Sequence, residues 1–185
     1  VLHLTEPGGD RDIPVALRAA RLAPFCAPPT IQSLDEFEPG PDEVYILGPT
    51  TPTRSTLAAL LTERFRLQFH TLVHPTAYVS PLATLGCGVF VGANSAVASG
   101  AALGEHVFVN RGATIGHDTT IGAFSRIQPG SNLGGLSRLG RGVTVGSGAT
   151  LLERLVIGDD AVIAAGAAVL DDVPESALVA GVPAK

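Results

Sequence analysis

Residues 109–121 read Val109-Asn-Arg-Gly-Ala-Thr-Ile115-Gly-His-Asp-Thr-Thr-Ile121, with an aliphatic residue at every sixth position. The same spacing runs without insertion over residues 79–174, which is sixteen consecutive hexads. A period of six fits neither an α-helix, at about 3.6 residues per turn, nor a lone strand, at about two. It is typical of a hexapeptide β-helix, whose stacked coils bury one continuous core. The sixteen first residues are Val79, Leu85, Val91, Val97, Leu103, Val109, Ile115, Ile121, Ile127, Leu133, Leu139, Val145, Leu151, Ile157, Ile163 and Val169.

The register of the hexads predicts where each side chain lies. If three hexads form one coil, residues eighteen apart lie above one another, and the first residue of each hexad points inward. Glycine is frequent at the second position, which indicates a corner where space is short and φ can be positive. These second-position glycines are residues 86, 92, 104, 116, 122, 134, 140, 146 and 158.

Composition narrows the class of protein. The chain has 185 residues and a net charge of −5, and no cluster of Lys and Arg occurs, which argues against nucleic acid as a partner. Charged residues are only 16% of a chain that is 45% hydrophobic, so a folded protein is expected rather than a disordered one. Trp and Met are absent, as suits a narrow β-helix interior that admits only small and branched side chains.

The expected location is cytoplasmic. No apolar run approaches the roughly 18 residues that span a bilayer, so no membrane partner is predicted. The first residues lack the charged and apolar regions of a signal peptide. The two cysteines, Cys26 and Cys87, are too few for a disulfide framework and are expected to be free thiols.

Residues 1–73 lack the six-residue period, and residues 74–185 contain it, so the sequence predicts two domains divided there. The first has most of the proline and alternating strand-like and helix-like segments, which indicates a small parallel α/β domain. Ser33, with Glu36 three residues later, resembles a helix start. The expected elements are a strand at 1–4, a helix at 13–22, a strand at 43–47, a helix at 53–65 and a strand at 66–73.

His117 is the best candidate for chemistry. As the third residue of its hexad it is expected to face outward near a corner, with Ser99 one coil below and Gly135 one coil above. An imidazole can take a proton at neutral pH, and a following carboxylate such as Asp118 can fix its tautomer. A backbone N–H can hold a developing oxyanion. The alternative is that His117 is simply an exposed coil residue.

Other candidates have stronger structural alternatives. Asn110 occupies a second position, where most hexads have Gly, and Asn also tolerates the left-handed conformation of a corner. Arginines such as Arg126 are most often solvated, although one can contact a phosphate. Gly8 and Gly9, beside a predicted helix start, can cradle a phosphate, but a lone Gly-Gly pair is a weak signal.

Four segments carry a resemblance to a known family. They are Asn110-Arg-Gly-Ala-Thr-Ile-Gly-His-Asp118, His74-Pro-Thr-Ala-Tyr-Val-Ser-Pro81, Asn132-Leu-Gly-Gly135 and the closing Gly181-Val-Pro-Ala-Lys185. Together they resemble the NeuD/PglD-type sugar O-/N-acetyltransferase family, from about residue 72 to the end. The resemblance implies a mainly β fold, in which a left-handed parallel β-helix of hexapeptide repeats follows a small, reduced Rossmann-like α/β domain.

The resemblance also implies an activity. An acetyl-CoA-dependent acetyltransferase would transfer acetyl directly to an amino or hydroxyl group of a sugar or nucleotide-linked sugar, as a homotrimer with sites between subunits and without a metal. His117 would be the general base, Asp118 would orient it, and the N–H of Gly135 would hold the thioester oxygen. Acetyl-CoA-binding positions would be Asn110, Arg126, Gly135, Ser147 and Ala165. Gly8, Gly9 and Gly48 would bind the substrate in the first domain.

Departures from the family keep other functions open. Arg126 stands where many members have a second His, and arginine does not exchange protons. Residues 6–10 read Glu-Pro-Gly-Gly-Asp, which departs from the family's Gly-x-Gly-Gly-His turn and allows a non-catalytic or nucleotide-sensing protein. A carrier-protein-dependent acyltransferase is another possibility. A γ-carbonic-anhydrase-like zinc enzyme is disfavoured, because the β-helix has only His106 and His117, eleven residues apart.

Overall fold

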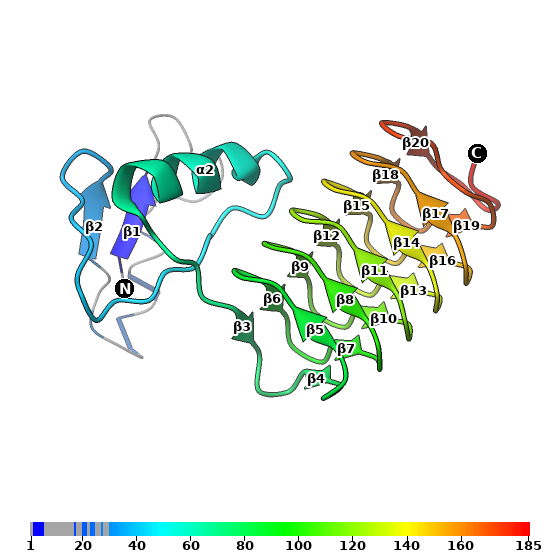
Figure 1. Ribbon diagram of the computed structural model, residues 1–185, viewed down its shortest axis with the longest axis horizontal. Helices are drawn as coiled ribbons and strands as arrows, with labels where there is room; N and C mark the ends of the chain where they lie inside the picture. Colours follow the sequence, from blue (N-terminus) through cyan, green and yellow to red (C-terminus); the bar gives the residue numbers. More distant parts are fainter. Residues whose placement is uncertain (1, 6–16, 18–19, 22, 25–26, 28–29) are drawn as a thin grey trace. The chain divides into compact units, whose positions relative to one another are not determined.

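The structure is a computed structural model that describes residues 2–5, 17, 20–21, 23–24, 27 and 30–185 (Figure 1). It divides into two compact units, residues 1–43 and residues 44–185. The second unit contains the β-helix together with residues 44–73, which the sequence assigned to the first domain. The functional division at residue 73 stays a prediction.

The first unit contains two paired strands. Strand β1 (Leu2–Thr5) lies parallel to β2 (Thr30–Ser33), which confirms the strand expected at residues 1–4 and parallel pairing. Ser33 ends β2 and does not start a helix; a turn follows, in which the Ser33 hydroxyl donates to a carboxylate oxygen of Glu36 at 2.9 Å. Most of the helix expected at residues 13–22 falls outside the described residues; the three that are described, 17, 20 and 21, are helical. A Rossmann-like arrangement is not evident in the part described.

Residues 44–73 contain the helix α2 (Arg54–Phe65), close to the predicted bounds. The helix ends at Arg66 in the left-handed conformation, and the Arg66 N–H donates to the carbonyl of Thr62 at 2.9 Å. Among the described residues, no helix has the length and apolarity needed to cross a membrane.

The two strands expected around α2 are largely absent from the described structure. Residues 43–47 contribute one isolated bridge, between Tyr45 and Phe69, because Val44 and Ile46 are exposed and have no sheet to join. The strand expected at residues 66–73 shrinks to β3 (Leu72–Val73), which pairs with a strand of the β-helix. The β-helix therefore begins at Leu72.

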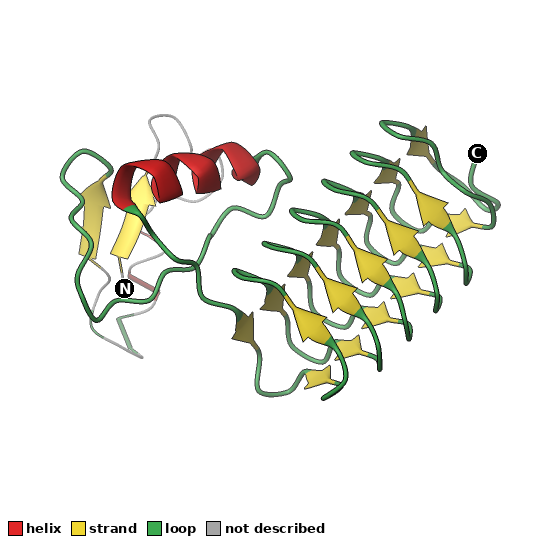
Figure 2. Ribbon diagram, in the orientation of Figure 1, coloured by secondary structure: helices red, strands yellow, loops and turns green. Residues whose placement is uncertain are grey.

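From Leu72 onward the chain winds into a three-sided parallel β-helix, the predicted fold class (Figures 1 and 2). The first face is a six-stranded sheet: β4 (Tyr78–Val79), β7 (Ala96–Val97), β10 (Thr114–Ile115), β13 (Asn132–Leu133), β16 (Thr150–Leu151) and β19 (Ala168–Val169). The second face is five-stranded: β5 (Thr84–Leu85), β8 (Ala102–Leu103), β11 (Thr120–Ile121), β14 (Arg138–Leu139) and β17 (Val156–Ile157). The third face is seven-stranded: β3, β6 (Phe90–Val91), β9 (Phe108–Val109), β12 (Arg126–Ile127), β15 (Thr144–Val145), β18 (Val162–Ile163) and β20 (Leu178–Val179).

The predicted register is confirmed. Ile115 pairs with Val97 below and Leu133 above, each eighteen residues away. First residues of the hexads are buried from Val91 to Val169, and fifth residues form a second buried ladder. Where a fifth residue is serine, its hydroxyl bonds to a backbone carbonyl; the Ser125 hydroxyl, for example, donates to the carbonyl of Gly140 at 2.9 Å.

One expectation about the corners is wrong. Positive φ occurs at the fourth position of the hexad, not the second; examples are Gly100 at 71° and Asp118 at 55°. Second-position glycines are required by close approach of the next coil instead. A β-carbon at Gly116 would lie 2.7 Å from the carbonyl carbon of Gly134 and from Cα of Gly135.

The three corners are named here by one residue each. The His117 corner joins the first and second faces and consists of residues 98–101, 116–119, 134–137 and 152–155, with 80–83 and 170–173 at its ends. The Asn110 corner joins the third and first faces, at residues 92–95, 110–113, 128–131, 146–149 and 164–167. The His106 corner joins the second and third faces, at residues 86–89, 104–107, 122–125, 140–143 and 158–161.

Candidate active site

His117 and Asp118 form a pair on the surface of the His117 corner. Nδ1 of His117 lies 2.9 Å from Oδ2 of Asp118, and the two side chains are 60% and 58% exposed. The backbone of this pair is attached to the coil below, where the carbonyl of Ser99 accepts the Asp118 N–H at 2.9 Å. Asp is among the residues that tolerate the left-handed conformation that Asp118 adopts.

Gly135 lies above the imidazole, as the register predicted. The Leu136 N–H donates to the carbonyl of His117 at 2.8 Å, which stacks the two corners. A β-carbon at Gly135 would come 2.7 Å from Nε2 and 2.8 Å from Cδ2 of His117. The space above His117 is therefore filled by its own ring, and only glycine at position 135 leaves room for it.

The His117–Asp118 pair can accept a proton through one ring nitrogen of His117. With Nδ1 bonded to a carboxylate, the neutral imidazole carries its proton on Nδ1 and its free lone pair on Nε2. Nε2 is then the atom able to accept a proton, and it lies beside the backbone of Gly135. The carboxylate stabilises the imidazolium that proton uptake creates.

Three of the residues predicted to bind acetyl-CoA lie at a different corner of the β-helix. Asn110, Ser147 and Ala165 belong to the Asn110 corner, which the first face separates from His117. Asn110 donates through Nδ2 to Oε1 of Gln128 at 3.3 Å and accepts the N–H of Arg111 at 2.8 Å. Its φ is not positive, so the alternative that Asn110 supplies a left-handed corner is wrong.

Arg126 lies on the third face, apart from the His117 and Asn110 corners. It begins β12 on the third face and donates through Nε to the hydroxyl of Thr144 at 3.1 Å. One chain thus brings together His117, Asp118 and Gly135, but not the remaining predicted residues. Gly48 is exposed with open space around it, whereas Gly8 and Gly9 lie outside the described residues.

A buried cluster at the His106 corner is the feature that sequence reasoning largely missed. Arg54, 4% exposed, donates to the backbone carbonyls of His106 and Ser125 and to those of Thr50 and Thr51. Burial, and then the charge of Arg126, lower the pKa of Arg54 to about 10. The cluster attaches the first turn of α2 to the β-helix.

The His106 side chain is stacked inside this cluster. Its ring centroid lies 4.8 Å from Phe69 and 4.9 Å from Phe124. Within the part of the chain that the structure describes, its Nδ1 is buried without a hydrogen-bond partner. Burial and the charge of Arg54 lower the pKa of His106, although Glu105 opposes them. The sequence signal for the stack is that His106 and Phe124 are eighteen residues apart.

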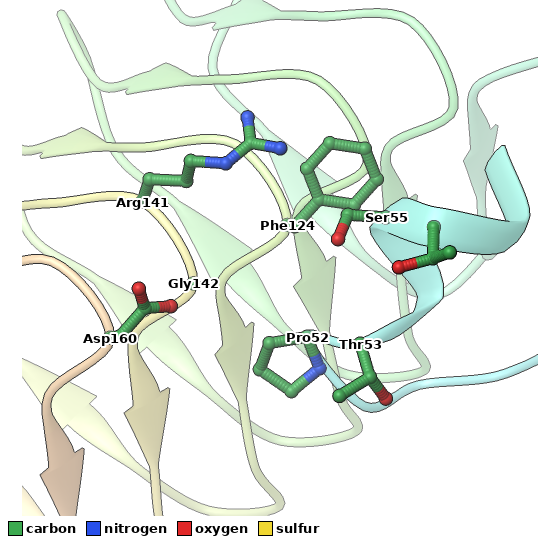
Figure 3. A pocket seen from close by; sticks show the side chains of 8 residues that line it. Pro52, Thr53, Ser55, Phe124, Arg141, Gly142 and Asp160 are labelled. Atoms are coloured by element: carbon green, nitrogen blue, oxygen red, sulfur yellow. The ribbon is translucent and has the colours of Figure 1, made fainter. Parts of the chain in front are cut away.

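A small pocket of about 230 Å³ lies beside this cluster, and none of the described residues predicted for the site lines it (Figure 3). Arg141 lies over the ring of Phe124, with its guanidinium carbon 4.7 Å from the ring centroid. The residues that line the pocket are Pro52, Thr53, Ser55, Thr56, Phe124, Arg141, Gly142 and Asp160. Among the described residues, no group of three or more His, Cys, Asp or Glu is placed to hold a metal ion.

Comparisons with known proteins place this geometry in a class. No protein-family model matches the chain, and no curated protein sequence matches it.

Solved structures do match the chain. The acetyltransferase domain of PglB from Neisseria gonorrhoeae is 27% identical with a TM-score of 0.76, and the alignment covers 100% of this chain and 98% of that one. A mutant of GDP-perosamine N-acetyltransferase from Caulobacter crescentus, in complex with CoA and GDP-perosamine, is 26% identical with a TM-score of 0.78, over 100% and 94% of the two chains. WeeI from Acinetobacter baumannii has the same fold, with a TM-score of 0.80 at 22% identity over 85% and 77% of the chains.

These likenesses confirm the resemblance that the sequence predicted. The fold is that of these acetyltransferases, and the likenesses at 26% and 27% identity indicate that the chain is an acyltransferase. Within that class the chain is similar, over its whole length, to sugar acetyltransferases of the NeuD/PglD type.

Proposed function

We propose that the protein transfers an acetyl group from acetyl-CoA to an amino group of a nucleotide-linked sugar. The observation that carries the proposal is the His117–Asp118 pair, held at 2.9 Å on an exposed corner beneath Gly135. The choice of donor and acceptor is supported by the Neisseria domain, which has been solved with acetyl coenzyme A, and by the Caulobacter enzyme, solved with CoA and GDP-perosamine.

The proposed reaction is a direct transfer. The amine nitrogen of the acceptor attacks the thioester carbon while Nε2 of His117 takes the amine proton. The backbone N–H of Gly135 stabilises the oxyanion of the tetrahedral intermediate, and Asp118 stabilises the imidazolium. The carbon–sulfur bond then breaks, and the CoA thiolate recovers the proton from His117. Atoms and charge balance without a metal.

We further propose a homotrimer, because one chain separates the predicted residues. His117 lies on one edge and the acetyl-CoA-binding set of Asn110, Ser147 and Ala165 on another, so a neighbouring copy would complete each site. Exposed leucines support contact at the His117 corner. Leu136, Leu152 and Leu170 lie in the three coils above the His117–Asp118 pair, and Leu82 lies at the start of the corner. The proposal keeps the cytoplasmic location predicted from the sequence.

The deciding experiment measures CoA release and the acetylated product. GDP-perosamine and UDP-linked amino sugars are offered with acetyl-CoA to the native chain and to His117→Ala. The native chain is expected to acetylate at least one of them, and His117→Ala to lose about 10²- to 10⁴-fold in kcat. Equal rates for the two proteins would remove His117 as general base.

Two further arms separate the alternatives. A carrier-protein thioester in place of acetyl-CoA tests the donor, and preference for it would establish the carrier-protein-dependent reaction. Mass spectrometry of the product distinguishes an N-acetyl from an O-acetyl group. Binding of a nucleotide sugar without turnover of any donor would favour a nucleotide-sensing protein.

A further inference from the structure

The position of the Asp118 carboxylate depends on a glycine, a residue without a side chain. Gly100 lies one coil below Asp118 in the His117 corner. A β-carbon built at Gly100 would overlap Oδ1 of Asp118 and would lie 3.0 Å from its Cγ. Any side chain at position 100 would push the carboxylate out of its place, away from its 2.9 Å contact with Nδ1 of His117.

We infer that Gly100 is a positioning residue for the proposed acetyl transfer, acting by leaving the space in which the Asp118 carboxylate meets His117. The inference rests on the proposed function. With Gly135 above the imidazole and Gly100 below the carboxylate, one glycine in the coil above and one in the coil below leave room for the pair. Neither Gly100 nor Ser99 below, nor Gly135 or Leu136 above, carries a charge; the next charged groups above are the paired Glu153 and Arg154.

The chain supplies a matched control for this geometry. Gly142 lies one coil below Asp160 in the His106 corner, with φ of 69° against 71° at Gly100. A β-carbon there would likewise overlap Oδ1 of Asp160 and lie 3.2 Å from Cγ. Gly142→Ala therefore introduces the same backbone strain and the same clash as Gly100→Ala, but at a corner without His117.

The test compares the two alanine variants by thermal stability and by steady-state kinetics. Both are expected to fold with lowered stability. Only Gly100→Ala is expected to lose kcat, by about 10- to 100-fold, with the KM for acetyl-CoA within about twofold. Equal activity of Gly100→Ala and Gly142→Ala would overturn the inference.

Coupling to Asp118 provides a second criterion. If Gly100 acts through the carboxylate, Gly100→Ala combined with Asp118→Asn should be no slower than Asp118→Asn alone. A double variant that is slower than Asp118→Asn, by the factor that Gly100→Ala causes alone, would contradict this. Should Gly100→Ala fail to fold, Gly100→Asn and Gly142→Asn replace the pair, because Asn tolerates the left-handed conformation.

Failure of the proposed function is separable from failure of this inference. If the native chain acetylates nothing, ¹⁵N NMR of the unliganded protein can still show which ring nitrogen of His117 carries the proton. The Nδ1–H form, which the contact with Asp118 favours, should be less populated in Gly100→Ala than in the native chain and in Gly142→Ala. An unchanged population would overturn the inference even where acetyl transfer is observed.

Discussion

Gly135 lies one coil above His117, so near that a β-carbon at position 135 would come 2.7 Å from Nε2 of the imidazole. The ring occupies the volume that any other residue at position 135 would need. The same contact places the basic nitrogen beside backbone rather than beside a side chain. An acceptor and a thioester can therefore approach Nε2 along the corner, where the His117 side chain is 60% exposed.

Gly135→Ala is expected to reduce kcat by about 10- to 100-fold, because the new methyl group displaces the imidazole from its place beside the backbone. The φ of Gly135 is not positive, so alanine brings no left-handed strain and the effect is steric. Steady-state kinetics of acetyl transfer measure it. In a His117→Ala background the same substitution should change the residual rate less than about twofold. A large loss in that background would show that Gly135 acts independently of the ring.

The period of six was sufficient to predict how this site is stacked. Once residues eighteen apart lie above one another, Gly135 must lie over His117, and the structure has it there. The same arithmetic places Gly100 under Asp118. The period does not say which corner residue takes positive φ. That position is often Gly, Asn or Asp, as at Gly100 and Asp118, but it also holds His106 and Phe124, and the frequent glycine of the second position draws attention to the wrong residue.

Segments outside the hexads were harder to predict, for a physical reason. Residues 43–47 have the β-branched and apolar content of a strand, yet only Tyr45 makes a bridge. Local propensity does not reveal whether a partner strand is present. Asn110 and His117 illustrate a different difficulty. The register places them at different corners, because they fall in consecutive hexads, but a single sequence does not show whether these corners meet in a neighbouring copy.

Arg54→Met is expected to lower the free energy of unfolding by about 2–3 kcal/mol. Methionine keeps an apolar stem but removes the Arg54 donor from the buried carbonyl of His106, whereas the carbonyl of Ser125 keeps the N–H of Phe108 at 2.9 Å. Denaturant unfolding of the two proteins measures the difference. Arg138→Met, at an exposed position on β14, is the control and should change stability by less than about 0.5 kcal/mol. Equal or greater stability of Arg54→Met would show that removing the buried charge outweighs the lost hydrogen bonds.

His106 predicts a pH dependence of stability. Burial and Arg54 lower its pKa below the ordinary value of 6.5, with Glu105 opposing. Between the folded and unfolded pKa values the unfolded chain binds more protons, so the free energy of unfolding falls as pH falls below about 6.5 and through the folded value. The slope from this one group is at most about 1.4 kcal/mol per pH unit.

His106→Phe should flatten that dependence while keeping the aromatic stack. Phe124 adopts the same left-handed conformation one coil above, with φ of 61°, so phenylalanine fits the backbone. Chemical unfolding at several pH values between about 7 and 5 measures the slope. His74→Gln, at an exposed site, should leave the slope unchanged. The same slope in His106→Phe and the native chain would assign the pH dependence to other groups.

The exposed leucines above the His117–Asp118 pair, Leu136, Leu152 and Leu170, predict a subunit interface at the His117 corner. Leu152, 49% exposed, lies on the coil above Gly135, and Leu152→Glu would bury an unpaired carboxylate in that interface. We expect the native chain to sediment as three copies and the Leu152→Glu variant as a smaller species. Acetyl transfer by the variant should fall at least about tenfold, because each site would lack its neighbour's Asn110 corner. Leu60→Glu, on the 42% exposed Leu60 of α2, is the control and should leave both measurements unchanged. A Leu152→Glu protein that dissociates yet keeps its rate would show that one chain contains the whole site, and one that stays assembled would place the interface elsewhere.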